Sequence, residues 1–249
     1  MYERHLLFKE PTNENQKIWR YLDITKLLDL INSSSLYFTR SDCFKDVFEG
    51  SFTKLSVDSR TRYYELLSKQ YPDASYGTPE ENATYYKELK TEIAANCWHM
   101  NDHESAAMWS LYLKSQDGIA IQSTYNRLVD CFEETDIDVM IGIVKYIDYD
   151  KAFINFADTF SPFLHKWKSF EHENEIRCIV WQPDFSEDAA YNLRSGGVKI
   201  KIDLIALIEK IYVSPDSPKW LSDLLQDIVK KLGFDFPIIN SRLSQLPLF

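Results

Sequence analysis

Hydrophobic and polar positions follow two periods along the chain. Residues 198–203 alternate strictly between apolar and charged side chains, which is typical of a half-buried strand. Apolar residues in 18–31 recur at helical spacing, and either Asp23 or Thr25 is placed to cap a helix that runs to Ser33. The same spacing in 220–231 predicts an amphipathic helix that ends before a glycine. Both periods in one chain favour a fold that contains helices and a sheet.

The rest of the chain predicts a helical insertion and the remaining strands and helices of the same fold. Residues 57–95 have helical composition, and a Pro- and Gly-containing stretch at 72–79 divides them into two helices that insert into the core fold. No repeat, low-complexity tract or linker is visible, so we expect one α+β domain over 1–249, with a mixed central β-sheet flanked by helices and the helical insertion at about 57–95. Further strands are expected at 3–9, 36–39, 97–99, 119–124, 138–149, 208–213 and 236–241, and further helices at 106–112, 125–131 and 151–168.

A charged strand face stands out within this frame. From residue 174 onward the chain alternates, so that Glu173, Glu175 and Arg177 share one face while mostly apolar residues occupy the other. A buried strand avoids such charges unless they are paired. One interpretation is catalytic: Glu175 holds a hydroxyl or acts on a cationic intermediate, and Arg177 binds a phosphate or fixes the glutamate. The other is an internal salt bridge.

Two aromatic motifs are candidate ligand contacts. Trp109 and Tyr112 lie three apart on one expected helix face, where they would either stack on a base or ring or pack into the core. A loop in 44–49 carries Asp46 and Glu49 between two phenylalanines. That loop would either cover a pocket or form a turn that its aromatic residues anchor.

Composition removes several function classes. The net charge of −10 and pI near 5.0 disfavour a nucleic-acid partner, because such binders carry basic surfaces. Seven glycines and the absence of a Gly-rich phosphate motif disfavour a phosphate cradle. Cys97, His99 and His103 suit zinc by type, but no fourth ligand is evident, so we expect no metal site. The start of the chain does not read as a signal peptide, and no apolar run approaches 18 residues, so the prediction is a cytoplasmic protein without a membrane partner.

Four separated segments resemble the bacterial and phage domain-of-unknown-function family 2971. Residues 36–50 resemble its pattern lyfs-p-FNDPFEg, with Asp46 and Glu49 matching and Lys45 and Val47 departing from it. Residues 97–121 resemble CFSe…MWshYa…G…i, and 168–177 resemble K…W..E.EwR. Residues 211–241 resemble the closing strand, helix and strand. The matching positions in the second and third segments are Cys97, Met108, Trp109, Tyr112, Gly118, Lys168, Glu173, Glu175 and Arg177. The family name carries no established chemistry.

The expected order of elements is also similar to the layout of ADP-ribosyltransferases. In that class a His or Arg on the first strand grips NAD, an aromatic loop stacks on nicotinamide, and a late glutamate stabilises an oxocarbenium-like transition state. Carried over to this chain, the resemblance implies Arg4 or His5 for the grip, Tyr37 with Phe38 for the stack, and Glu175 for the glutamate.

Three functions follow as hypotheses. The first is an enzyme that acts on a nucleotide such as NAD by glycosidic transfer or hydrolysis, as a phage-defence or toxin-like effector. The second is a non-catalytic ligand- or protein-binding sensor, and the third is a metal-dependent nuclease, for which Glu88 and Lys90 have a suitable spacing. The first requires that Glu175 and Arg177 reach a solvent-accessible hollow rather than neutralise each other in a closed pair. Substrate and oligomeric state are left open.

Overall fold

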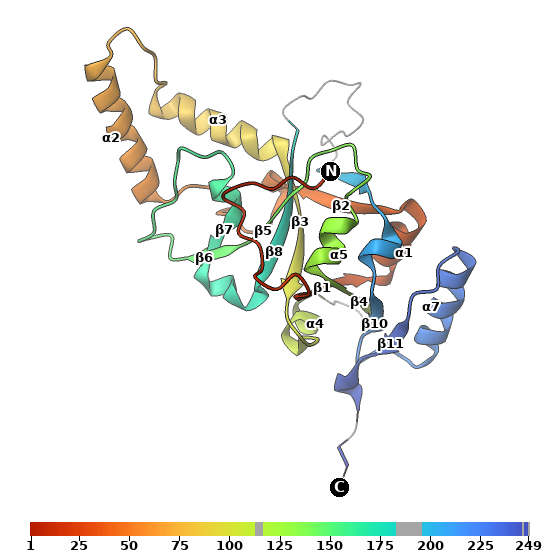
Figure 1. Ribbon diagram of the computed structural model, residues 1–249. Coiled ribbons are helices and arrows are strands. Elements are labelled where there is room, and N and C mark those ends of the chain that lie inside the picture. Colours follow the sequence, from red (N-terminus) through yellow and green to blue (C-terminus); the bar gives the residue numbers. More distant parts are fainter. Residues whose placement is uncertain (113–116, 183–195, 246, 249) are drawn as a thin grey trace.

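A computed structural model describes the chain except for residues 113–116, 183–195, 246 and 249 (Figure 1). The strands are β1 Lys17–Asp23, β2 Ser35–Arg40, β3 Ile93–Met100, β4 Gly118–Thr124, β5 Met140–Ile143, β6 Lys145–Ile147, β7 His165–Trp167, β8 Glu175–Trp181, β9 Gly197–Lys201, β10 Lys210–Val213 and β11 Ile238–Asn240. The helices are α1 Ile24–Ser33, α2 Lys54–Gln70, α3 Pro79–Glu92, α4 Ala106–Tyr112, α5 Tyr125–Asp130, α6 Leu204–Leu207 and α7 Trp220–Lys231. Short 3-10 turns lie at η1 Ser41–Cys43, η2 Ser161–Leu164, η3 Lys168–Glu173 and η5 Arg242–Ser244.

The main sheet is mixed, which confirms the expected α+β class. Among the described residues it contains nine strands, in the order β11-β10-β4-β1-β3-β2-β9, with β8 pairing β3 and β5. The β10–β11 pair is parallel and the other pairs in this sheet are antiparallel. A separate parallel pair, β6–β7, lies beside β8 (Figure 1).

Strand β3 has two partners along one edge, and the sheet splits between them. Its last residues pair with β1 through Trp19 and His99, whereas its first residues pair with β2 through Thr39 and Ala95. Between these points β1 and β2 diverge, and the Arg20 guanidinium donates to the carbonyl of Cys97 across the gap at 2.9 Å. Along its other edge β3 pairs with β8 over its whole length.

The larger core lies on one face of the sheet, under α1, α5 and α7. Alternate residues of β8, Ile176 and Cys178, face this core together with Trp98 of β3. The opposite face carries α4, which packs on Trp19 and Tyr21, and the β6–β7 pair. The charged residues of β8 therefore lie on the face that the main core does not use.

The insertion forms two helices, α2 and α3, that project from one side of the sheet (Figure 1). Thr53 caps the first, and Thr78 with Glu81 forms a capping box at the second. The expected range of 57–95 runs slightly too far, because residues 93–95 already belong to β3. Few residues of these helices are buried, which agrees with an insertion outside the core.

Several local expectations are wrong. Residues 3–9 form no strand; only Tyr2 makes an isolated bridge, to Val139. Residues 17–23 form β1, although the helix expected after them is correct and Asp23 caps it at Lys26 N. The expected helix at 151–168 is replaced by irregular chain, a 3-10 turn and β7. Pro162 has no N–H for a helical hydrogen bond, and the Asn155 and Asp158 side chains accept from nearby backbone N–H groups instead.

Candidate functional site

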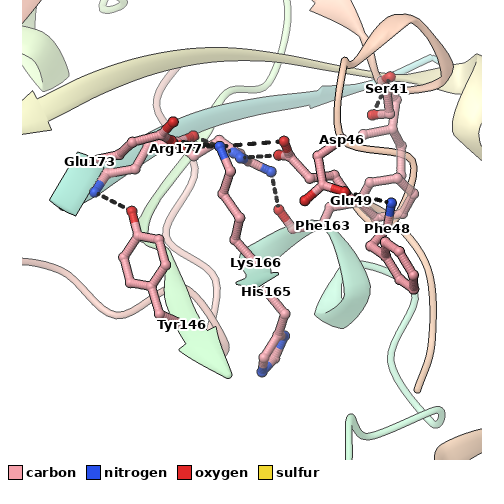
Figure 2. Close-up of polar contacts among 12 residues, drawn as sticks. Ser41, Asp46, Phe48, Glu49, Tyr146, Phe163, His165, Lys166, Glu173 and Arg177 are labelled. Atoms are coloured by element: carbon pink, nitrogen blue, oxygen red, sulfur yellow. Dashed lines mark hydrogen bonds and ion pairs between the residues drawn. The ribbon is translucent and has the colours of Figure 1, made fainter. Parts of the chain in front are cut away.

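Arg177 lies at the centre of a buried charged cluster. Its Nε donates to Glu175 Oε1 at 2.7 Å, its Nη1 to the Phe163 carbonyl at 2.7 Å, and its Nη2 to Glu49 Oε2 at 2.5 Å (Figure 2). The guanidinium also stacks over the Phe44 ring, 5.4 Å from its centroid. Arg177 is 1% exposed and Glu175 4%. The Arg177 side chain of β8 thereby fixes the loop that carries Glu49, the 3-10 turn η2 that carries Phe163, and the carboxylate of Glu175.

Lys166 joins the same cluster from β7. Its ammonium is 2.5 Å from Glu173 Oε2, 3.4 Å from Glu49 Oε1 and 3.5 Å from Glu175 Oε2. Glu173 arrives from the 3-10 turn η3, not from β8, because Asn174 adopts a left-handed conformation with φ of 38° and reverses the chain before the strand begins. The Glu175 backbone N–H donates to the Tyr146 hydroxyl on β6 at 2.8 Å.

The cluster holds one carboxylate more than it holds cations. Glu49, Glu173 and Glu175 face Lys166 and Arg177 through five close ion pairs. With all five groups ionised, three negative and two positive charges leave a net charge of −1. An unbalanced charge inside a protein is costly, so it creates a preference for a further cation or a proton.

The pKa values show where that preference falls. Burial raises the pKa of Glu175, but the opposite charges of Arg177 and Lys166 lower it by a larger amount. The resulting pKa is about 2, so Glu175 remains ionised. Burial raises the pKa of Glu173; Lys166 opposes this, and the Glu175 and Glu49 carboxylates add to it, so the pKa stays above its ordinary value. Burial disfavours the charge of Lys166, yet Glu175, Glu49 and Glu173 raise its pKa. Glu173 is thus the member that most readily takes up a proton.

Glu49 reaches Arg177 because its loop is tightly packed. Phe48 packs edge-on against Tyr149 and Trp167, and the Asp46 carboxylate accepts from the Phe48 N–H at 3.0 Å. Gly50 has φ of 71°, and a Cβ there would lie 2.6 Å from the Phe163 ring. The aromatic residues therefore anchor the loop, and the loop delivers a carboxylate into the protein.

The two aromatic residues of α4 have different roles. Trp109 is buried, stands edge-on to Tyr21 at 4.9 Å and donates to Glu104 at 3.0 Å. Trp109 therefore packs in the core, which is one of the two roles that its spacing allowed. Tyr112 is 50% exposed. Burial raises the pKa of the Tyr112 hydroxyl, and the Glu173 and Glu175 carboxylates add to this, so the hydroxyl lies within electrostatic range of the cluster.

His99 is the cross-strand partner of Glu175 and has an unused nitrogen. Its Nδ1 lies 2.5 Å from the Glu173 carbonyl, a contact that requires a proton on Nδ1 and leaves Nε2 as an acceptor. Nε2 is buried and finds no hydrogen-bond partner among the residues that the structure describes, although His99 is only 6% exposed. Burial lowers the pKa of His99, so the ring is neutral near pH 7. This atom can accept an N–H or O–H from a ligand.

The remaining residues that were expected to contact a ligand lie outside the cluster. Lys168 is exposed, and the neighbouring Lys166 takes its place in the ion pairs. His5 packs edge-on against Phe8 and Phe160 at 5.3 and 5.4 Å, and Arg4 pairs with Glu10 at the surface. Neither lies on a strand, so neither occupies the first-strand position that the resemblance implied for it. The Phe38 ring is in the core, facing Phe132, and is unable to stack on a ligand together with Tyr37.

The roles expected for Glu175 and Arg177 are wrong, because the two side chains form a closed, buried pair and do not reach the solvent-accessible hollow that the enzyme hypothesis required of them. Three of the five Arg177 N–H groups donate to protein acceptors and the side chain is 1% exposed, so it is not placed to bind a phosphate from solvent. Glu175 is bound by Arg177 and Lys166 and is almost fully buried, so it is not placed to contact a reacting atom directly. Among the expected catalytic residues, Glu173 is the one that combines partial exposure with a perturbed pKa.

Sequence reasoning missed Lys166, His99 as an acceptor, Tyr146 and Arg20. Lys166 lies in a three-residue strand that is too short to produce a pattern. Arg20 bridges β1 and β3, and its guanidinium lies over the Trp98 ring, 5.9 Å from the ring centroid. It also interacts electrostatically with Tyr112 and Glu175. A signal for Arg20 was present, because it is the one charged residue in the otherwise apolar stretch 18–22.

No group of three or more His, Cys, Asp or Glu in the described ranges is placed to hold a metal ion. Glu88 and Lys90 lie on α3, as the sequence predicts. None of the described helices is long and apolar enough to cross a membrane.

Comparison with known proteins adds a weak structural likeness. No protein-family model matches the chain, and no curated protein sequence does. The resemblance to family 2971 therefore stays a prediction. Among solved structures the chain is similar to Thermus sp. 2.9 DarT in complex with ADP-ribosylated ssDNA. The sequence identity is 10% and the TM-score 0.40, over 94% of this chain and 97% of that chain. A likeness of this size carries no argument about residues or chemistry.

Proposed function

We propose that the chain is a nucleotide-handling enzyme that binds NAD and cleaves its glycosidic bond, by transfer or hydrolysis. The observation that carries this proposal is the excess carboxylate of the buried cluster, which lies beside the Tyr112 and Tyr146 hydroxyls. The nicotinamide ring of NAD is a cation, and so is the ribose carbon from which it departs. Aromatic rings next to negative charge suit both.

The chemistry assigns a task to each reachable group. The C1′–N1 bond breaks, and its electron pair leaves with nicotinamide, which becomes neutral. The carboxylate of Glu173, which is only partly buried, stabilises the positive charge that develops on the ribose. A water molecule or an acceptor hydroxyl then bonds to C1′ and loses its proton. His99 Nε2 accepts a hydrogen bond from the carboxamide or from a ribose hydroxyl.

Glu175 and Arg177 act here as positioning residues. They hold Lys166 and Glu49 in place, and so they set the charge that Glu173 experiences. A role as a phage-defence or toxin-like effector belongs to the same proposal, because glycosidic cleavage of NAD depletes a cofactor on which cells depend.

A non-catalytic binding module is the second candidate. The closed Glu175–Arg177 pair favours it, since such a pair is able to serve as a scaffold without any reaction. Both candidates place a cationic ligand at the same residues, but only the first predicts turnover.

The test separates binding from turnover. Purified protein is incubated with NAD, nicotinamide release is followed by chromatography, and NAD binding is followed by calorimetry. The enzyme proposal predicts nicotinamide release that the Glu173→Gln variant loses, with the fold retained in circular dichroism. Glu171→Gln is the matched control, because Glu171 is an exposed carboxylate on the same 3-10 turn. NAD binding without nicotinamide release would refute the enzyme and support the non-catalytic binding module. The absence of both binding and release would refute both candidates.

A further inference from the structure

A second hollow lies outside the charged cluster, within the α2–α3 insertion. Its volume is about 380 Å³, within the range of roughly 300–1,000 Å³ that is usual for small-molecule sites. Side chains of α2 and the first residues of α3 line it, among them Arg60, Tyr64, Glu65, Ser68, Lys69 and Asn82. The lining is therefore polar and aromatic.

Arg60 is the unusual member of this lining. It is 5% exposed, and its guanidinium lies between two rings, 5.3 Å from the Phe52 centroid and 4.8 Å from that of Tyr86. Its buried Nη1 finds no hydrogen-bond partner in the part of the chain that the structure describes. No carboxylate within those ranges forms an ion pair with it. The rings favour the cation and the Tyr86 hydroxyl interacts with Arg60, but Nη1 itself is left without an acceptor from the described residues.

The charges around the hollow favour an anion. Two cations, Arg60 and Lys69, line it against the single carboxylate of Glu65, although the whole chain has a net charge of −10. Tyr64 adds a ring that stacks on Tyr76, with centroids 6.1 Å apart and planes inclined at 20°. A phosphate would accept from the unpartnered Nη1 in a charge-assisted bond, and an attached ring would pack against Tyr64.

We propose that this hollow binds a small organic phosphate with an aromatic group, of the nucleoside monophosphate class. Arg60 contacts the phosphate, Lys69 adds long-range attraction, and Tyr64 contacts the ring. The site is separate from Glu173 and His99, because its residues come from the α2–α3 hairpin.

Calorimetry of the full chain with AMP and with inorganic phosphate tests this site. The proposal predicts saturable AMP binding that Arg60→Lys weakens about tenfold or more, through loss of the planar donor set. Lys69→Ala, at an exposed position, weakens it by a smaller factor that decreases at high salt. Arg62→Gln is the matched control: Arg62 is an exposed arginine on the same helix that does not line the hollow, and its loss leaves the affinity unchanged.

Two results would overturn the proposal. One is the absence of saturable binding for both probes. The other is AMP binding that survives Arg60→Lys and Lys69→Ala but disappears in Glu173→Gln, since the nucleotide would then occupy the charged cluster. NAD cleavage is tested by Glu173→Gln, whereas the phosphate site is tested by Arg60→Lys and Lys69→Ala. Failure of one proposal is therefore distinguishable from failure of the other.

Discussion

Arg177 Nη2 and Glu49 Oε2 lie 2.5 Å apart, although 128 positions separate the two residues in the sequence. Both side chains are buried, and the contact joins strand β8 to the loop that precedes the helical insertion. A buried charge pair of this kind constrains the loop more than it strengthens the fold, because desolvation offsets much of the attraction. Its importance lies in fixing where the third carboxylate of the cluster is placed.

Removing Glu49 from its pair with Arg177 should lower the free energy of unfolding by more than the intact pair contributes to it. Glu49→Gln removes one of the two carboxylates that pair with the buried Arg177, together with the contact to Lys166, and we expect a loss of about 3–5 kcal/mol in the free energy of unfolding. Urea denaturation followed by tryptophan fluorescence measures it. The matched control is Asp29→Asn, which breaks the exposed Lys199–Asp29 pair and should cost about 0–1 kcal/mol. Equal losses in the two variants would contradict the arrangement.

Glu175 and Glu173 should give stability opposite dependences on pH. The pKa of Glu175 in the folded chain is about 2, below the ordinary value of 4.5, so its contribution is present above pH 4.5 and lost between pH 4.5 and 2. The pKa of Glu173 is raised, so its contribution is present below pH 4.5 and is lost as the pH rises through the folded value.

Unfolding curves of Glu175→Gln and Glu173→Gln across pH 2–8 measure both effects. The difference in stability from the unsubstituted chain should change below pH 4.5 for Glu175→Gln and above pH 4.5 for Glu173→Gln. A change confined to the same pH window in both variants would show that the two carboxylates do not differ as described.

Gly50 should tolerate no side chain. A Cβ there meets the Phe163 ring at 2.6 Å, and the backbone φ is 71°. Gly233 has a similar φ of 90° but no atom within 4 Å of the added Cβ, so it isolates the backbone effect. Gly233→Ala should cost about 1–2 kcal/mol of unfolding free energy. Gly50→Ala should cost about 1–3 kcal/mol more because of overpacking. Thermal or urea unfolding of the two variants gives the comparison.

The periodicity of hydrophobic residues predicts the helices and strands better than it predicts which of them lie next to each other in the fold. Strand β8, helix α1 with its Asp23 cap, and the two insertion helices follow from local pattern, because each depends on side chains a few residues apart. Strand β1 was hidden because its buried residues continue the apolar spacing of the helix after it. Such a boundary depends on tertiary pairing, which local spacing does not contain.

The candidate site shows the same division. The alternation of β8 correctly places Glu175 and Arg177 on one face, and an internal salt bridge was one of the two interpretations. The involvement of Glu49 and Lys166 depends on contacts across the fold, so no spacing in the sequence reveals it. Glu173 reaches the cluster through the left-handed turn at Asn174, although strand alternation was the reason for grouping it there.

His99 should make nucleotide binding sensitive to acid. Nε2 accepts a hydrogen bond only while the ring is neutral, and burial lowers the pKa of His99 below its ordinary value of 6.5. NAD affinity should therefore be constant from pH 8 to 6.5 and should fall at lower pH, while His99→Gln should bind weakly at every pH. Calorimetric titration across this range measures the effect. Affinity that is unchanged by His99→Gln would remove His99 from the site.

The central claim is that excess negative charge beside Tyr112 selects a cationic ring. NAD in its oxidised and reduced forms tests this most directly, because the two molecules have nearly the same shape but only the oxidised nicotinamide is charged. We predict that the oxidised form binds at least tenfold more tightly in calorimetry at pH 7.5, and that Glu173→Gln reduces this ratio. Equal affinity for the two forms, or binding of neither, would contradict the account.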